Sequence, residues 1–296
     1  MSSASAEAPA GLVVVDKPSG WTSHDVVGRM RRIAGTRKVG HAGTLDPMAT
    51  GVLVLGVGRA TRLLGHLQLA DKEYLATIRL GVSTVTDDAE GEVTATADAS
   101  AVAESAVTEG VSRLTGNIEQ VPSSVSAIKV DGVRSYARVR SGEDVALPAR
   151  PVTVSVFEIS SLRREADVLD VDVRVECSSG TYVRALARDL GSALGVGGHL
   201  TMLRRTRVGG FGLDVARTLE QHAEQLGLVT IGDAARACFP SVDVGEDVAR
   251  AVGFGQKLPD LALGADGPVA VFGPGQEFLA LYERHRAGAR PVAVFT

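Results

Sequence analysis

The sequence predicts an α+β fold that is built on a mixed, mainly antiparallel sheet and followed by a small β domain. Strand and helix patterns are interspersed without the regular alternation of doubly wound folds. The clearest strand alternates Val171, Val173, Val175 and Cys177 with charged residues, which is typical of an antiparallel strand with one face in water. The last 56 residues carry short apolar runs broken by Gly and Pro, which predicts a separate β-rich unit.

The N-terminal elements follow from local signals. Residues 1–10 are rich in Ala and Ser and are expected to form a frayed tail. Residues 12–15 are an apolar run before a Pro-Ser-Gly turn, which favours a strand. Thr22 stands three residues before Asp25, a spacing that caps a helix, and Gly35 is placed to end that helix.

The same mixture of strands and helices continues along the chain. Residues 52–57 and 74–80 have strand patterns, while residues 101–114 carry apolar side chains at helical intervals. A second helix is expected to begin after Gly180 and to end at Gly195.

Composition excludes several classes of protein. With 45% hydrophobic and 22% charged residues, the chain is globular rather than disordered. The longest clean apolar stretch, residues 51–57, is far shorter than the ~20 residues that span a bilayer, and no signal peptide is visible, so we expect no membrane association. Cys177 and Cys238 lie far apart without a CxxC pattern, which favours a reducing cytoplasm.

The net charge of −4 conceals a segregated distribution. Residues 11–70 carry eight Lys/Arg against three Asp/Glu, whereas residues 71–120 carry three against ten. Because phosphate binding follows the local field and not the overall charge, the basic block can still bind nucleic acid.

The sequence lacks the usual cofactor motifs. No GxxxxGK[ST] loop is present, and Gly56-Val57-Gly58 lacks the third glycine of a dinucleotide loop. The six histidines contain no HxxxH pair. We therefore expect neither a cofactor nor a metal ion.

The most unusual segment is residues 40–51, in which three glycines, one proline and two threonines surround a single carboxylate, Asp46. This loop delivers Asp46 just before the strand of residues 52–57, and loops held on rigid strands are where catalytic groups concentrate. Composition alone nevertheless favours a structural Asp that makes a turn hydrogen bond.

Several motifs occur in a fixed order between residues 11 and 215. They are DKPSGWTS from Asp16, KVGHAGTLDPMATGVL from Lys38, GRATR from Gly58, KEY from Lys72, PSSVSAIKVDG from Pro122, CSSGTYVR from Cys177 and LRR from Leu203. Together they resemble the TruB family of bacterial tRNA pseudouridine synthases. The resemblance implies an isomerase that converts uridine 55 in the tRNA T-loop to pseudouridine without a cofactor, moving the bond at ribose C1′ from uracil N1 to C5.

The resemblance also implies roles for individual residues. Asp46 matches the family's nucleophile, Arg184 matches the arginine paired with it, and Tyr74 matches the residue that stacks on the flipped uracil and helps to remove its C5 proton. The expected substrate-binding residues are His41, Tyr182, Leu203, Lys17 and Asp88. Position 85, often acidic in the family, is Val85 here, which leaves Asp88 as the candidate supporting acid.

Basic residues are expected to hold the RNA backbone. Residues 121–151 resemble the family's RNA-gripping insertion, and phosphate contacts from such a segment would position the stem. The expected contacts are Lys129, Arg134, Arg138, Arg140, Arg204 and Arg205. The expected partner is the T-stem-loop of tRNA, with no obligate protein partner. We accordingly expect a synthase domain over residues 11–238 and a PUA-like domain over residues 240–296.

Two other functions also fit the residues. An RNA-binding or RNA-folding factor would use the basic segments alone, with Asp46 as a structural turn residue. A hydrolase with an acidic nucleophile would act on a small substrate and would need no basic insertion. The RNA-binding alternative predicts that an Asp46→Asn variant stays fully active, whereas the synthase predicts that it loses turnover.

Overall fold

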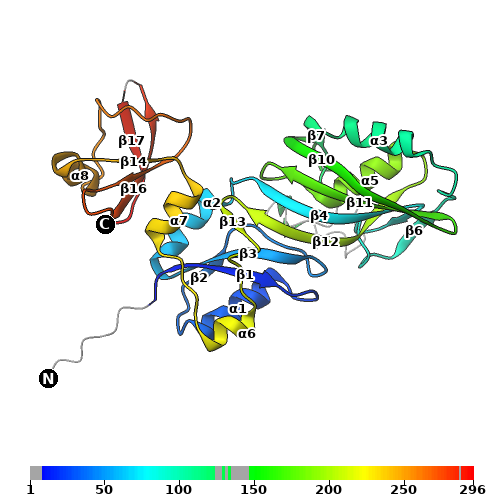
Figure 1. The fold of residues 1–296 in the computed structure, drawn as a ribbon, viewed down its shortest axis with the longest axis horizontal. Helices are drawn as coiled ribbons and strands as arrows, with labels where there is room; N and C mark the ends of the chain where they lie inside the picture. The colour runs from blue at the N-terminus through cyan, green and yellow to red at the C-terminus, as the bar shows by residue number, and fades with distance from the viewer. Residues whose placement is uncertain (1–8, 124–128, 131–132, 135–146, 287) are drawn as a thin grey trace.

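The computed structural model describes residues 9–123, 129–130, 133–134, 147–286 and 288–296. A large unit around a central sheet is followed by a smaller C-terminal unit, and the two lie side by side (Figure 1). Residues 1–8 of the predicted tail lie outside the described residues.

A nine-stranded sheet forms the centre of the large unit. Its main path runs through β1 (Gly11–Lys17), β3 (Thr50–Val57), β12 (Gly198–Val208), β4 (Lys72–Leu80), β11 (Val168–Cys177), β10 (Arg150–Glu165) and β7 (Gly116–Gln120). The short strands β2 (Val39–His41) and β13 (Phe211–Gly212) pair with β3 and β12. Among the described strands of this sheet, β3 and β12 run parallel and the other pairs run antiparallel, which confirms the predicted mixed, mainly antiparallel sheet.

Helices pack on one face of this sheet. They are α1 (Ser23–Ile33), α3 (Glu104–Arg113), α5 (Val183–Ala193) and α6 (Leu219–Glu224) (Figure 1). The predicted start of α1 is confirmed, because the Thr22 hydroxyl accepts from the Asp25 N–H and the Asp25 carboxylate accepts from the Thr22 N–H. Gly35 and Gly195 follow α1 and α5 with φ of 62° and 74°, the left-handed conformation that ends a helix.

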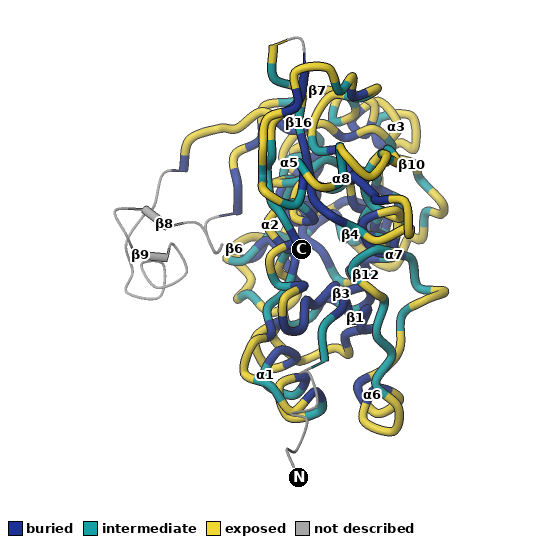
Figure 2. The backbone as a smooth tube through the Cα atoms, turned by 90° about the vertical axis from the view of Figure 1, so that its left-hand side faces the viewer, coloured by how far each residue is buried: buried dark blue, intermediate teal, exposed yellow. Residues whose placement is uncertain are grey.

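The opposite face of the sheet has two different surroundings. Near β1 and β3 it is covered by α7 (Ile231–Cys238) and by the C-terminal unit, so β3 is buried on both faces and its apolar residues run without a break. Over β4 and β11 the face carries charged pairs such as Arg79 and Asp170, 2.8 Å apart. Figure 2 shows the buried segments gathered along the sheet, with exposed segments around them.

The C-terminal unit is a four-stranded sheet with one helix. Its elements are β14 (Ser241–Asp243), α8 (Glu246–Gly253), β15 (Val269–Phe272), β16 (Phe278–His285) and β17 (Gly288–Val294). It has a small core of its own around Tyr282, and it shares a second core with the large unit, in which Phe272, Leu281 and Phe295 pack with Val14 of β1. The shared core anchors this unit to the edge of the central sheet.

Shorter elements complete the described chain. The 3-10 helix η1 (Gly58–Leu63) and α2 (Leu64–Leu67) follow β3 directly. Two hairpins, β5 (Val82–Thr84) with β6 (Val93–Thr96) and β8 (Lys129–Val130) with β9 (Val133–Arg134), stand apart from the main sheet. Within the described residues, no helix is both long and apolar enough to cross a membrane.

Gly51 tests the junction between β3 and β12. It has a φ of 98°, and a Cβ there would lie 2.2 Å from the backbone oxygen of Arg205. We expect Gly51→Ala to lower the free energy of unfolding by more than ~2 kcal/mol, because both the conformation and the contact oppose a side chain. Gly28→Ala in α1 is the matched control, since nothing lies within 4 Å of its added Cβ. It should gain about 0.5–1 kcal/mol. Urea denaturation curves that coincide for the two variants would contradict this account.

Candidate active site

A cavity of about 330 Å³ opens beside the loop that precedes β3. Its walls come mainly from four segments that are distant in sequence: the loop around Asp46, the start of β4, the start of α5 and the middle of β12. Six of the eight residues predicted to be catalytic or to bind the substrate line it, namely Asp46, Tyr74, Arg184, His41, Tyr182 and Leu203. The sheet therefore gathers motifs that lie far apart along the chain.

The loop that carries Asp46 is pinned on both sides of that residue. Before it, the Ser23 hydroxyl of α1 accepts from the Leu45 N–H at 2.9 Å and donates to the Leu45 carbonyl at 3.1 Å. After it, the Pro47 carbonyl accepts from the Gly20 N–H at 2.8 Å. These bonds fix the backbone of an irregular loop, so the Asp46 side chain is held in one position at the cavity wall.

Lys17 at the end of β1 donates hydrogen bonds that hold the same loop. It is fully buried, and its ammonium group donates to the carbonyls of Pro18 at 3.0 Å, Trp21 at 2.6 Å and Pro47 at 3.1 Å. Burial lowers its pKa to about 8. All three N–H groups of Lys17 are used by the protein and it does not line the cavity, so its contact with the substrate stays a prediction.

An ion pair joins the loop to α5. Arg184 Nε lies 3.0 Å from Asp46 Oδ2, and its Nη1 donates to the Thr86 carbonyl at 2.7 Å. The Arg184 side chain is 6% exposed, whereas that of Asp46 is 34% exposed. The guanidinium is therefore buried in the protein while the carboxylate faces the cavity, which keeps one charged oxygen atom accessible.

Asp88 lies behind this pair and does not line the cavity. Its side chain is 4% exposed, its Oδ2 is 3.6 Å from Arg184 Nε, and its Oδ1 accepts from the Glu90 N–H at 3.1 Å. The predicted contact of Asp88 with the substrate stays a prediction. Asp88 is a second carboxylate that balances the buried Arg184 and orients it toward Asp46.

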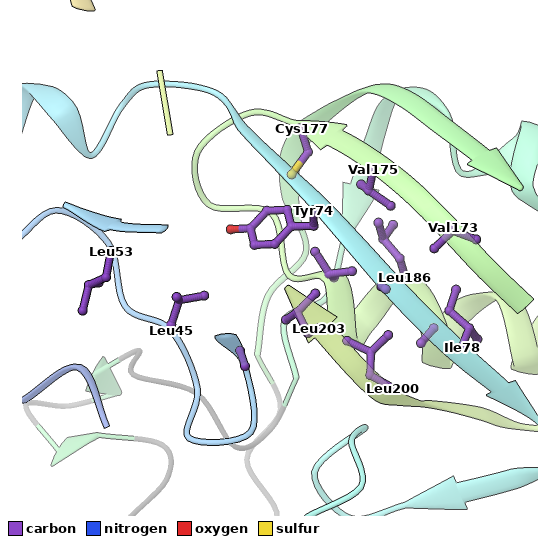
Figure 3. Close-up of a cluster of buried hydrophobic side chains, with 14 of the residues drawn as sticks. Leu45, Leu53, Tyr74, Ile78, Val173, Val175, Cys177, Leu186, Leu200 and Leu203 are labelled. Carbon is purple, nitrogen blue, oxygen red and sulfur yellow. The ribbon is translucent and has the colours of Figure 1, made fainter. Parts of the chain in front are cut away.

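Tyr74 and Leu203 form the apolar part of the cavity. They project from neighbouring strands, and Figure 3 shows the Tyr74 ring leaving the apolar cluster with its hydroxyl toward the loop that carries Leu45. Both side chains are buried. Burial raises the pKa of the Tyr74 phenol, so its hydroxyl stays protonated at neutral pH.

Tyr182 stands at the start of α5 and is held there by a residue from β7. The Gln120 side chain accepts from the Tyr182 N–H at 2.8 Å and donates to the Tyr182 carbonyl at 3.1 Å. Gln120 is buried and is the last residue before the predicted insertion. This reciprocal pair of bonds fixes the backbone that presents the Tyr182 ring to the cavity.

His41 contributes a polar group without a protein partner. Its Nδ1 atom is buried and makes no hydrogen bond among the described residues. Burial and then the neighbouring His24 lower the pKa of His41, and the two rings meet edge to face at 5.6 Å. His41 is therefore a neutral imidazole at neutral pH in the wall of the cavity.

The basic residues predicted to bind RNA fall into three groups. Arg205 is 1% exposed, donates to the carbonyls of Val52, Thr44 and Gly43 and lines the cavity, and its contact with an RNA phosphate stays a prediction. Arg204 is partly exposed and pairs with Asp16 at 2.8 Å, and its contact with RNA stays a prediction.

The remaining predicted RNA contacts belong to the insertion. Lys129 and Arg134 face each other as backbone partners in the β8–β9 hairpin, and their contact with RNA stays a prediction. Arg138 and Arg140 lie outside the described residues. Among the described residues, no group of three or more His, Cys, Asp or Glu side chains is arranged to hold a metal ion.

Three residues that sequence reasoning did not single out help to build the site. Ser23 and Gln120 act through single hydrogen-bond pairs with residues distant in sequence, and no local pattern announces such contacts. Lys72 also lines the cavity. A signal for Lys72 was present, because it lies two residues before Tyr74 on a strand and so shares its face.

The comparisons with known proteins agree along the whole chain. Residues 31–183 match the TruB family pseudouridylate synthase N-terminal domain, residues 184–234 match the tRNA pseudouridylate synthase B C-terminal domain, and residues 239–296 match the tRNA pseudouridine synthase II C-terminal domain. The chain is 61% identical over 292 residues to tRNA pseudouridine synthase B of Streptomyces griseus, covering 97% of both chains. It is 60% identical to the protein of that name from Cutibacterium acnes, covering 92% of both.

Solved structures share the fold at lower identity. A crystal structure of a Cbf5-Nop10-Gar1 complex is similar with a TM-score of 0.73 and 27% identity, covering 97% of this chain and 84% of that one. An H/ACA RNP bound to a substrate RNA containing 2′-deoxyuridine is similar with a TM-score of 0.72 and 26% identity, covering 97% and 85%.

Lys17 tests how the loop of Asp46 is held. We expect Lys17→Met to lower the free energy of unfolding by about 3 kcal/mol, because three carbonyls lose their common donor. Thermal or urea unfolding measures this effect. Lys257→Met is the matched control, since it removes the same charge from an exposed position and should stay within about 0.5 kcal/mol of the wild type. A Lys17→Met protein as stable as the control would show that the loop does not depend on this lysine.

Proposed function

We propose that uridine 55 in the T-loop of tRNA is the target of this enzyme and that Asp46 is its nucleophile. The chain belongs to the TruB family of pseudouridylate synthases, which isomerise uridine in tRNA. The observation that carries this proposal is the ion pair of Asp46 with the buried Arg184 at the wall of a cavity. A base in a duplex or a stacked loop is out of reach of such a cavity, so the target nucleotide must be extruded into it.

The ion pair suits Asp46 to nucleophilic attack. A carboxylate beside a guanidinium is charged at neutral pH and needs no general base to activate it. The bonds to Arg184, together with the pinned backbone at Leu45 and Pro47, hold the attacking oxygen in place before the substrate arrives. Such positioning lowers the entropic part of the barrier.

The rest of the cavity supplies what a flipped base requires. The Tyr74 ring offers a face on which uracil can stack, and Leu203 of the neighbouring strand adds apolar surface. His41 lines the same cavity and adds a neutral polar ring beside the extruded nucleotide. Tyr182, held by Gln120, closes the cavity at the start of α5.

The reaction needs no cofactor on chemical grounds. Uridine and pseudouridine are isomers, so no atom is added and no electron is transferred to another molecule. One bond from ribose C1′ to N1 is broken, one bond from C1′ to C5 is made, and a proton moves from C5 to N1. A nucleophile and proton acceptors from protein or water are sufficient for these steps.

The first test is release of tritium from a T-stem-loop RNA labelled at uridine C5, since a new bond at C5 must displace that hydrogen. We expect stoichiometric release by the wild type and none by Asp46→Asn, with RNA affinity within about tenfold because Asp46 is not a phosphate contact. Asp260→Asn, an exposed carboxylate in the C-terminal unit, is the matched control and should be fully active.

The outcomes separate the three functions. Tight RNA binding with no tritium release by either protein would favour an RNA-binding factor. An Asp46→Asn protein that binds RNA and turns over like the wild type would remove Asp46 from the mechanism. Equal loss of binding and turnover would assign Asp46 to RNA contact. A wild-type protein that hydrolyses a small ester or amide and does not act on RNA would favour a hydrolase, provided that Asp46→Asn abolishes the hydrolysis.

A further inference from the structure

The cavity carries more positive charge than its ion pair uses. Among the residues that line it, Lys72, Arg184 and Arg205 are basic and only Asp46 is acidic. Arg184 is balanced by Asp46 and by Asp88 behind it. Neither Lys72 nor Arg205 has a carboxylate within ion-pair distance among the described residues, so two buried cations face a cavity whose substrate base is neutral.

Lys72 has a donor available to a ligand. It is 7% exposed, and its ammonium group donates to the carbonyls of Gln68 at 2.7 Å and Ala70 at 2.5 Å. An ammonium group has three N–H donors, so one remains. The two bonds hold the amine at the cavity wall and leave the third N–H for whatever enters the cavity.

Arg205 lies next to Lys72. Lys72 Cε and an Arg205 Nη atom both lie within 4 Å of the point where a Cβ on Gly43 would be, and Gly43 has none. The absent side chain thus leaves the two cations side by side beneath the loop of Asp46. Arg205 is held by three backbone carbonyls and keeps its charge there.

The depth of these cations decides what they face. A phosphate of the RNA backbone stays at the protein surface, whereas Lys72 and Arg205 are both buried in the wall that also contains Tyr74. A base that stacks on Tyr74 is the part of the nucleotide that comes near them. An ammonium group beside a neutral base has little to stabilise in the ground state, but it has much to stabilise if that base becomes an anion.

The isomerisation passes through such an anion. When the bond from C1′ to N1 breaks, its electron pair stays on the uracil ring and spreads over N1 and the two carbonyl oxygens. The charge disappears when C5 bonds to C1′, the C5 proton leaves and N1 is protonated. The ring therefore carries a negative charge between these two events, whether Asp46 attacks uracil C6 or ribose C1′.

We propose that Lys72 is a catalytic residue that contacts the detached uracil ring and, with Arg205 beside it, stabilises the negative charge of that ring. This inference rests on the function proposed above. Lys72 would stabilise the ring after the bond breaks and not when the substrate binds. Removing its charge should therefore slow the chemical step and leave RNA affinity unchanged.

The proposal predicts a pH dependence. Burial, and then the charge of Arg205, lower the pKa of Lys72 to about 8, while Cys177 of β11 and the adjacent Asp71 oppose this effect. Lys72 is thus mostly protonated at pH 7, and its stabilising charge is lost as the pH rises through 8. Tyr74 and Cys177 titrate at higher pH, but Lys17 also has a pKa of about 8. Variants of Lys72 are therefore needed to assign the change.

The test is the single-turnover rate of tritium release from the labelled T-stem-loop between pH 6 and pH 9.5, for the wild type, Lys72→Met and Lys72→Arg. We expect the wild-type rate to fall above pH 8. Lys72→Met should be about 100-fold slower at pH 7, with RNA affinity within threefold, and its rate should not decrease above pH 8. Lys72→Arg should keep most of the rate, and its rate should also not decrease above pH 8, because arginine stays charged.

The controls separate the possible failures. Lys257→Met removes a lysine charge far from the cavity and should match the wild type at every pH. A Lys72→Met protein as fast as the wild type, or one that loses affinity and rate equally, would overturn the proposal while the proposed function stands. If Lys72→Met fails to fold, a rate of Lys72→Arg that still decreases above pH 8 as in the wild type would overturn the proposal. A wild-type protein without tritium release would overturn both proposals.

Discussion

The structure depends on one constraint, which is that a carboxylate must face a cavity while its partner guanidinium stays buried. Arg184 can be buried because two carboxylates and the Thr86 carbonyl surround it, and only one of those carboxylates, Asp46, is accessible. An isolated buried charge would cost far more than the pair does. The positions of α5, of the loop before β3 and of the turn around Asp88 all follow from the need to bring these groups together.

The rest of the fold holds the loop of Asp46 in place. The loop of Asp46 has little regular structure of its own, and it is held by Ser23 of α1, by the buried Lys17 at the end of β1 and by Arg205 of β12. Those elements are fixed by a sheet with apolar layers on both faces near β1 and β3. The C-terminal unit contributes to the second layer through Phe272 and Phe295, so it supports the strands that carry the site as well as extending the protein.

Local patterns predicted what local physics controls. The capping box at Thr22 and the alternation along β11 could be inferred from sequence, because each depends on neighbouring residues. The class of the sheet followed from the irregular order of strand and helix patterns, but not its pairing, since partners such as Thr50 and Arg204 lie far apart in the chain. The ordered motifs placed six residues at one cavity. Burial is what the motifs could not indicate for Lys17, Asp88 and Arg205: a charged residue in a motif suggests contact with a ligand, whereas these three side chains are buried and also bond to the protein itself. Gln120 could not be found, since its partner is 62 positions away.

If the ion pair serves the chemistry, Arg184 acts through Asp46 and not by holding RNA. The single-turnover rate and the RNA affinity of Arg184→Lys separate these roles, with the exposed Arg113→Lys as control. Lysine keeps the charge but cannot bond Asp46 and the Thr86 carbonyl from one planar group. We expect a rate about 100-fold lower with affinity within threefold. A variant as fast as the control, or one that loses rate and affinity by the same factor, would contradict it.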